Sequence, residues 1–289
     1  MRSSTFLAAL LLQFLIQNVL AESIRAIYLF KDVMKSNTAA LKTSGFNTLI
    51  MFGVGVIENG DIKYYSNTPG SKDVLIASKG TYVGGDALAQ KVGSFKAGNG
   101  TGVNRLEISM NSNNVRNLMS KNDQNLLRNF QALKKAWSLD AVNNDDEKEY
   151  DAASTVAFAK MLGKLGYKYT IAPYTRTNIW SSVISQCNKG LKESERLLDR
   201  VYLQCYDGGV RNDPVSWQKS LGMKVVPLIW VTNDSKPGQG NSAAQSRSRF
   251  SGWHQRESLG GGGYWNDFDI EKMKSSYKQY GDVLTSVFK

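Results

Sequence analysis

The sequence predicts an α/β fold, a (β/α)8 TIM barrel. Eight apolar, β-prone segments alternate with helical patterns to the end of the chain, and no Pro/Gly/Ser-rich linker interrupts them. Eight strands, each followed by a helix, is the number that closes such a barrel. The competing architecture is a doubly wound open sheet. We disfavour it because the first strand leads into Lys31-Asp32-Val33-Met34 instead of a G-x-G-x-x-G turn.

The predicted strands share a richness in branched and aromatic residues. In chain order they are Arg25–Phe30, Phe46–Ile57, Val103–Met110, Trp137–Asp145, Tyr167–Tyr174, Arg200–Tyr206, Lys224–Val231 and Gly263–Phe268. The predicted helices have apolar residues at helical spacing. They are Thr38–Thr43, Asp86–Phe95, Asp123–Trp137, Asp151–Leu165, Asn178–Leu191, Pro214–Leu221, Ala243–Glu257 and Ile270–Phe288.

Local signals fix the ends of some of these elements. Asp151 is a good N-cap for the fourth helix, and Gly166 is a good terminator. The turn signal Asn59-Gly60 predicts a hairpin, in which Ile62–Tyr65 pairs back after the second strand. We therefore expect a short excursion between the second and third strands of the barrel.

The N-terminus has the layout of a secretory signal peptide. Arg2 precedes a mostly apolar run from Phe6 to Leu20, and the small residue Ala21 follows. We expect residues 1–21 to be cleaved and residues 22–289 to form a single barrel domain outside the cell. The alternative is an uncleaved membrane anchor, although the apolar run is short for a span. The sequons at Asn99 and Asn233 predict glycosylation in a eukaryotic source.

Composition narrows the classes of partner. The formal net charge is +11, but Lys and Arg are dispersed, and the chain has no arginine-rich arm or RNA-binding signature. We expect a monomer without a nucleic-acid partner or stable membrane association. One alternative stays open, a protein that binds nucleic acid or another polyanion through its basic surface, with an affinity that falls steeply as the salt concentration rises. The two cysteines, Cys187 and Cys205, are either a disulfide or a pair of buried thiols. A single histidine argues against a histidine-based zinc site.

An acidic cluster follows the predicted fourth strand of the barrel. In an extended strand, Asn143, Asp145 and Glu147 point to the same side and would line one cavity. Crowded carboxylates raise each other's pKa, which keeps a carboxylic acid protonated as a proton donor. The pattern therefore predicts acid catalysis on a glycosidic bond. The alternative is a solvated acidic turn that caps the next helix.

The cluster resembles the D-x-x-D-x-D-x-E signature of glycoside hydrolase family 18, at Asp140, Asp145 and Glu147. Three more segments are similar to the family in order and position, so the resemblance spans most of the mature chain. They are Tyr202-Leu203-Gln204-Cys205-Tyr206-Asp207, Tyr264-Trp265 and Ile108-Ser109-Met110-Asn111-Ser112. Within the last of these, both glycines of the family's S-x-G-G are replaced.

The resemblance implies retaining hydrolysis of β-1,4-linked N-acetylglucosamine glycans, with the acetamido oxygen of the substrate as nucleophile and no cofactor or metal. It implies that Glu147 is the acid and base, that Asp145 holds the acetamido N–H and that Tyr206 binds the acetamido oxygen. Trp265 would stack on the sugar ring. The further substrate-binding residues that we expect are Asn143, Asp207, Gln204 and Asp140.

Two residues depart from the family pattern. Asn143 replaces a central aspartate, so an ionisable neighbour of Asp145 is lost, and we expect slower turnover and a changed pH profile. Asn111 places a side chain where the family packs a glycine. These departures keep a second class open, a non-catalytic chitin- or glycan-binding protein. For the remaining aromatics near strand ends, namely Tyr28, Phe52, Tyr174 and Trp230, we favour packing in the core, and the alternative is that they line further sugar subsites.

Overall fold

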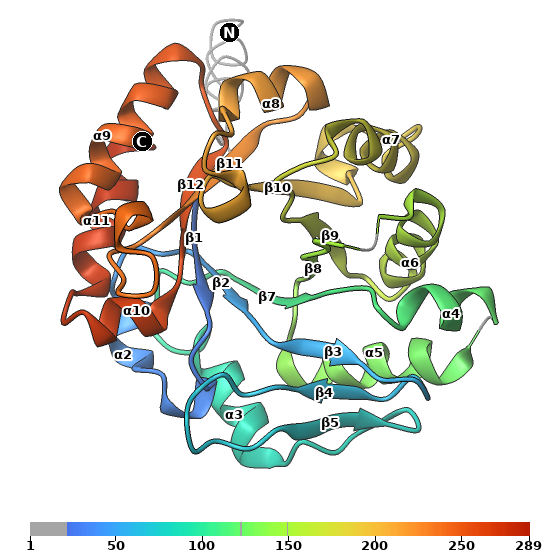
Figure 1. Cartoon of the computed structure of the whole chain (residues 1–289). Helices are drawn as coiled ribbons and strands as arrows, with labels where there is room; N and C mark the ends of the chain where they lie inside the picture. Colours follow the sequence, from blue (N-terminus) through green and yellow to red (C-terminus); the bar gives the residue numbers. More distant parts are fainter. Residues whose placement is uncertain (1–21, 122, 149) are drawn as a thin grey trace, which may run out of the picture.

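The computed structural model describes residues 22–121, 123–148 and 150–289, so the predicted signal peptide lies outside the described residues. Eight parallel strands form a closed barrel, which confirms the predicted fold class (Figure 1). Around the barrel these strands are β1 (Ile24–Leu29), β2 (Thr48–Met51), β7 (Arg105–Met110), β8 (Ala141–Asn144), β9 (Lys168–Ile171), β10 (Leu198–Gln204), β11 (Val225–Trp230) and β12 (Gly261–Trp265).

Helices surround the barrel on the outside (Figure 1). The α-helices are α2 (Thr38–Lys42), α3 (Asp86–Ser94), α4 (Val115–Ser120), α5 (Gln124–Trp137), α6 (Ala152–Lys164), α7 (Thr177–Cys187), α8 (Pro214–Leu221), α9 (Ala243–Arg256), α10 (Asp267–Lys272) and α11 (Tyr277–Val287). The short 3-10 turns are η1 (Val33–Lys35), η2 (Glu193–Glu195), η3 (Asp207–Gly209) and η4 (Pro237–Gln239). The Asp151 side chain caps α6 as predicted, since it accepts a hydrogen bond from the Ser154 N–H.

An antiparallel sheet interrupts the barrel pattern after β2. Its order is β3 (Val54–Val56), β4 (Ile62–Tyr64), β5 (Val74–Ser78) and β6 (Thr81–Tyr82), and it lies beside α3 and α5 (Figure 1). The β3–β4 pair is the predicted hairpin, and Gly60 in its turn has φ +80°. The predicted strand Phe46–Ile57 is broken at Gly53, whose φ is +87° and where a Cβ would lie 2.5 Å from the Tyr65 carbonyl oxygen.

Two further boundaries differ from the prediction. The helical pattern Ile270–Phe288 is two helices, α10 and α11, because Lys274 between them has φ 55°. The predicted strand Trp137–Asp145 is only β8, since α5 continues to Trp137 and the left-handed Ser138 then turns the chain. Beyond these, β5, β6 and α4 were not predicted, because short elements carry too few residues for a periodic signal.

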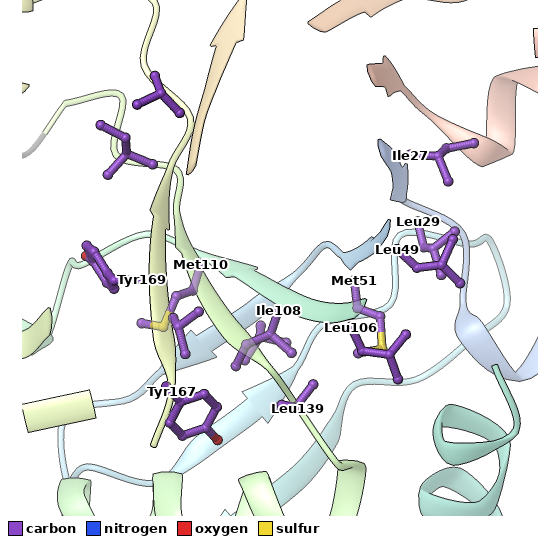
Figure 2. Packing of buried hydrophobic residues seen from close by; sticks show 14 of the residues in the cluster. Ile27, Leu29, Leu49, Met51, Leu106, Ile108, Met110, Leu139, Tyr167 and Tyr169 are labelled. Atoms are coloured by element: carbon purple, nitrogen blue, oxygen red, sulfur yellow. The ribbon is translucent and has the colours of Figure 1, made fainter. Parts of the chain in front are cut away.

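The alternation of side chains along the strands divides the core into two parts. Residues that face the helices form one cluster, which includes Ile27, Leu29, Leu49, Met51, Leu106, Ile108 and Met110 (Figure 2). Their neighbours along each strand, such as Ala26, Tyr28 and Ile50, face the barrel interior. On β8 the outward residue is Val142, so Asn143 points inward. Asn143 therefore faces the barrel interior, but it does not line the pocket that contains Asp145 and Glu147.

The structure also decides two chemical alternatives. Cys187 and Cys205 are buried free thiols, and burial raises the pKa of the Cys187 thiol to about 11. Asn99 is exposed, whereas Asn233 is only 2 % exposed and its Nδ2 donates to the Val231 carbonyl oxygen at 3.0 Å. In the folded chain, therefore, the Asn99 sequon lies at the surface and the Asn233 amide is buried. Among the described residues, no helix combines the length and apolarity needed to cross a bilayer.

Candidate active site

A pocket of about 650 Å³ opens at the C-terminal ends of the barrel strands, where the chemistry of (β/α)8 barrels takes place. It brings together most of the predicted site residues. The residues that line it are Phe52, Asn111, Asn113, Asp145, Asp146, Glu147, Lys148, Tyr174, Gln204, Tyr206, Asp207, Gly208, Trp230 and Trp265. Segments far apart in the sequence, after β2, β7, β8, β9, β10, β11 and β12, thus meet in one cavity.

Asp145 lies in the wall of this pocket, directly after β8. Its Oδ1 accepts a hydrogen bond from Gln204 Nε2 at 3.1 Å, and its backbone N–H donates to the Met110 carbonyl oxygen at 2.9 Å. Burial, together with the charges of Glu147 and Asp146, raises the pKa of Asp145 to about 7. Gln204 also donates to the Ala172 carbonyl oxygen at 2.9 Å, so its amide is held in place. Asp145 is therefore the carboxyl that is poised between its two charge states near neutral pH.

Glu147 lies at the mouth of the same pocket and is exposed. Its main chain is fixed by two phenols, since its carbonyl oxygen accepts from Tyr150 at 2.8 Å and from Tyr174 at 3.4 Å. The carboxylate is thus presented to solvent from an anchored segment. The expectation that crowding raises a pKa within this acidic cluster is met at Asp145.

Asp146, between these two carboxylates, also borders the pocket but is only 2 % exposed. Its carboxylate accepts hydrogen bonds from the Ser112 N–H at 2.7 Å, from the Ser112 hydroxyl and from Asn144 Nδ2 at 2.7 Å. Asn144 Nδ2 also donates to the Tyr169 hydroxyl oxygen at 3.0 Å. These bonds connect the loop after β8 to the loop after β7, and so position both Asp145 and Glu147.

Tyr206 and Trp265 form the aromatic part of the pocket. Their rings are nearly parallel, at 17°, with centroids 6.3 Å apart. The Tyr206 hydroxyl makes no hydrogen bond within the described ranges, although the side chain is only 8 % exposed. Burial, and then the charges of Asp145 and Glu147, raise the pKa of Tyr206 well above its usual value. The phenol is therefore a neutral hydrogen-bond donor that is available to a ligand.

Three other aromatic rings pack against the Trp265 indole. It lies 4.9 Å from Phe52, 5.5 Å from Phe30 and 5.5 Å from Tyr28, as measured between centroids. Buried Asp267 supports this wall, because its Oδ1 accepts from the Phe30 N–H at 2.7 Å and from the Lys31 N–H at 3.0 Å. The Trp265 ring, which lines the cavity, is thus fixed in position by its aromatic neighbours.

Asn143 lies inside the barrel and does not line the pocket. Its Oδ1 accepts from the Tyr28 hydroxyl at 2.9 Å, and its Nδ2 donates to Thr170 Oγ1 at 2.9 Å. Thr170 donates in turn to Glu107 at 2.7 Å. The structure thus places the Asn143 amide in a buried position inside the barrel, where each of its polar atoms already makes a hydrogen bond.

Asp140 does not join the site at all. It precedes β8 at the N-terminal end of the barrel, and its Oδ2 accepts from Lys96 Nζ at 2.7 Å and from the Leu106 N–H at 2.8 Å. Because the pocket is at the opposite end of β8, the predicted role of Asp140 in substrate binding does not fit its position. Asp207 does line the pocket, at an exposed rim where it is paired with Lys236.

The structure also places the remaining aromatics. Phe52, Tyr174 and Trp230 line the cavity, which was the less favoured of the two alternatives, whereas Tyr28 is buried as expected. Asn113 and Lys148 lie on loops with no motif of their own. Asn111 is exposed at the rim, so its side chain does not crowd the base of the site. In the ranges that the structure covers, no group of three or more His, Cys, Asp or Glu forms a metal-binding arrangement.

Barrel and pocket together define a (β/α)8 protein with the fold of the family 18 chitinases. Solved structures with this fold include a chitinase from Pseudoalteromonas aurantia (TM-score 0.63, 14% identity, 92% of this chain and 98% of that chain). A chitinase from Chromobacterium violaceum has TM-score 0.60, 10% identity and coverage of 91% and 98%. A family 18 chitinase from Cycas revoluta, solved in complex with allosamidin, has TM-score 0.58, 14% identity and coverage of 90% and 99%. At these identities the likeness concerns the fold.

Comparisons of the sequence alone are negative. The sequence matches no model of a known protein family, and it matches no curated protein. The relationship is therefore visible in the path of the chain and not in overall sequence similarity.

Proposed function

We propose that this chain is a secreted glycoside hydrolase of family 18 that cleaves β-1,4-linked N-acetylglucosamine glycans, such as chitin. The observation that carries the proposal is that Asp145, Glu147, Tyr206 and Trp265 line one pocket at the C-terminal end of the barrel. The fold supports the same class, since the similar solved structures are chitinases. Removal of residues 1–21 on export would leave a chain that starts just before β1.

The proposed reaction is substrate-assisted. Trp265 stacks on the sugar at the cleavage point, and Tyr206 donates its phenolic proton in a hydrogen bond to the acetamido oxygen. Asp145 accepts a hydrogen bond from the acetamido N–H, which turns the acetamido oxygen toward the anomeric carbon. Glu147 protonates the leaving oxygen, and a cyclic oxazolinium intermediate forms. Glu147 then deprotonates a water molecule that opens this ring with net retention.

Each contact within the site supports its proposed role. A carboxyl with a pKa of about 7 binds the amide N–H when it is charged, and the negative charge that it then carries offsets the positive charge of the oxazolinium ion. The Tyr206 hydroxyl has no hydrogen bond to another described residue that it would have to give up on binding. Glu147 is exposed to solvent, so the leaving group can depart and the attacking water molecule can enter beside it.

A second candidate is a glycan-binding protein that hydrolyses slowly or not at all. Asn143 favours it, because this residue cannot ionise and both polar atoms of its amide are already used by Tyr28 and Thr170. It therefore cannot share a proton with Asp145, as a carboxyl at this position would. We retain the hydrolase as the first proposal because Glu147 has little purpose in a pocket that only binds sugar.

The deciding experiment replaces Glu147 with Gln. The hydrolase predicts that Glu147→Gln abolishes cleavage of chitin oligomers and keeps their dissociation constant within about threefold, because only a proton donor is lost. A matched control is Glu58→Gln, an exposed glutamate on the hairpin. If neither wild type nor variant cleaves the oligomers while both bind them equally, the chain is the binding protein.

A further inference from the structure

A second cavity lies at the N-terminal end of the barrel, opposite the candidate active site. Parallel strands all begin at this end, so residues at the starts of β7, β9 and β10 meet at one mouth. The cavity has a volume of about 360 Å³. The residues that line it are Asn104, Arg105, Lys134, Asp140, Gly166, Lys168 and Arg200. It therefore combines four cationic side chains with one carboxylate.

Nearby acids neutralise only part of this charge. Arg105 is fully paired, since it binds Asp199 through two nitrogens at 2.7 and 2.8 Å and Glu107 through Nε at 2.6 Å. Asp140, the single acid in the wall, accepts from Lys96 at 2.7 Å. The carboxylates around the cavity are thus already committed to other cations.

Three cations remain with unused hydrogen-bond donors. Lys134 Nζ donates to the Leu139 carbonyl oxygen at 2.7 Å, and Lys168 Nζ donates to the Arg196 carbonyl oxygen at 2.6 Å. Of the residues that the structure covers, no carboxylate lies within 4.0 Å of either ammonium group. An ammonium carries three N–H donors, so Lys168 keeps two of them, and Lys134, whose Nζ also lies 4.4 Å from the centroid of the Tyr167 ring, keeps at least one.

Arg200 has spare donors as well. All its hydrogen bonds within the described chain come from Nη1, which donates to Thr48 at 2.9 Å and to the Tyr202 hydroxyl at 3.2 Å. Its distance to the nearest carboxylate oxygen, on buried Glu107, is 3.8 Å. A guanidinium has five N–H groups in a planar fork that matches two oxygens of one anion.

The cavity is a partly desolvated site with excess positive charge. Lys134, Lys168 and Arg200 are all half-buried. Burial lowers the pKa of Lys134, the repulsion of Lys96 lowers it further, and the charge of Asp140 opposes both. Cations gathered in this way repel each other unless an anion lies among them.

We propose that this cavity binds a phosphate or sulfate group, held by Lys134, Lys168 and Arg200. A tetrahedral oxyanion offers several acceptor oxygens and up to two negative charges, which suits three converging cations. The cavity has room for one such group and a few water molecules, and it is too small for a nucleic-acid duplex or a layer of polysaccharide chains. The site is separate from the glycan pocket, so the proposal does not depend on the proposed function.

The test is calorimetric titration of the mature chain, residues 22–289, with inorganic phosphate at constant ionic strength in NaCl. We expect saturable binding of one phosphate per chain. Lys168→Gln and Lys134→Gln should each weaken it about tenfold, because each removes charge-assisted hydrogen bonds. Lys219→Gln changes the net charge equally at an exposed position on α8, and it should leave the dissociation constant unchanged.

The outcomes separate a built site from general surface charge. Absence of saturable phosphate binding to the wild type, or equal weakening in Lys219→Gln, would overturn the proposal. Thermal scans in chloride check that the variants fold, and Arg200→Lys, which keeps the charge but loses the fork, should weaken binding as an independent variant. Glycerol phosphate that competes at equal concentration assigns the site to a phosphate ester, whereas failure to compete assigns it to the free anion.

Discussion

Replacing Asp145 with Asn should stabilise the fold at alkaline pH while it removes activity. The pKa of Asp145 is about 7 in the folded chain, compared with about 4 for an aspartate in an unfolded chain. Between these values the folded chain holds a proton that the unfolded chain has lost. The stability that this proton linkage contributes is therefore present at low pH and is lost as the pH rises through 7.

The magnitude follows from the same difference. About three pKa units correspond to at most about 4 kcal/mol of unfolding free energy. Because Asp145 borders a solvent-filled pocket, screening reduces this, and we expect about 1–3 kcal/mol. For a chain of this size that is a rise of about 3–10 °C in the thermal midpoint at pH 8.5. Gln204 keeps its acceptor, since Asn retains Oδ1.

The assay is thermal unfolding of wild type and Asp145→Asn, followed by circular dichroism from pH 4 to pH 8.5. The two midpoints should agree near pH 4 and diverge as the pH rises. Glu58→Gln, at an exposed position, should give no divergence. The reasoning fails if Asp145→Asn shifts the midpoint equally at every pH, or if it lowers the midpoint at pH 8.5.

Three further substitutions test other parts of the site. Tyr206→Phe removes only a hydroxyl that makes no hydrogen bond to another described residue. Initial-rate assays on chitin oligomers should show a loss of about 100-fold in kcat, and the thermal midpoint should not change. An unchanged rate would contradict the proposed hydrogen bond from Tyr206 to the acetamido oxygen. Asn143→Asp places a carboxylate oxygen opposite a hydroxyl that already donates to a buried carboxylate, and thermal scans should show a loss of stability that grows from pH 5 to pH 8. A gain in stability would contradict this hydrogen-bond network. Ser112→Ala leaves buried Asp146 without one donor, which should cost about 1–3 kcal/mol in denaturant titrations and also lower kcat, with rescue of both by Ser112→Thr. Loss of stability without loss of rate would show that this contact does not position the loop.

The barrel was predictable because its signal is local and repeated. Most of the eight strands carry their own apolar run, and the alternation along β8 places Asn143 on the opposite side from outward-facing Val142. The convergence of Asp145, Tyr206 and Trp265 also followed, since residues after parallel strands meet at one end of a barrel.

The predictions that failed depended on where each strand begins and on contacts between segments that are distant in sequence. Asp140 shares a motif with Asp145, but β8 starts only at Ala141, so Asp140 lies at the other end of the barrel. The pocket position of Phe52 depends on segments that are remote in sequence. The cationic cavity is of the same kind, since Lys134 and Arg200 carry no motif and meet only in three dimensions.

The most direct measurement is proton NMR of the products during the first minutes of hydrolysis of chitin pentamer. A pocket in which the acetamido group is the nucleophile and Glu147 acts twice predicts that the new reducing end is β at first and only later mutarotates to the equilibrium mixture. An initial α product would contradict substrate-assisted retention. A pentamer that stays intact while it occupies the pocket would contradict hydrolysis itself.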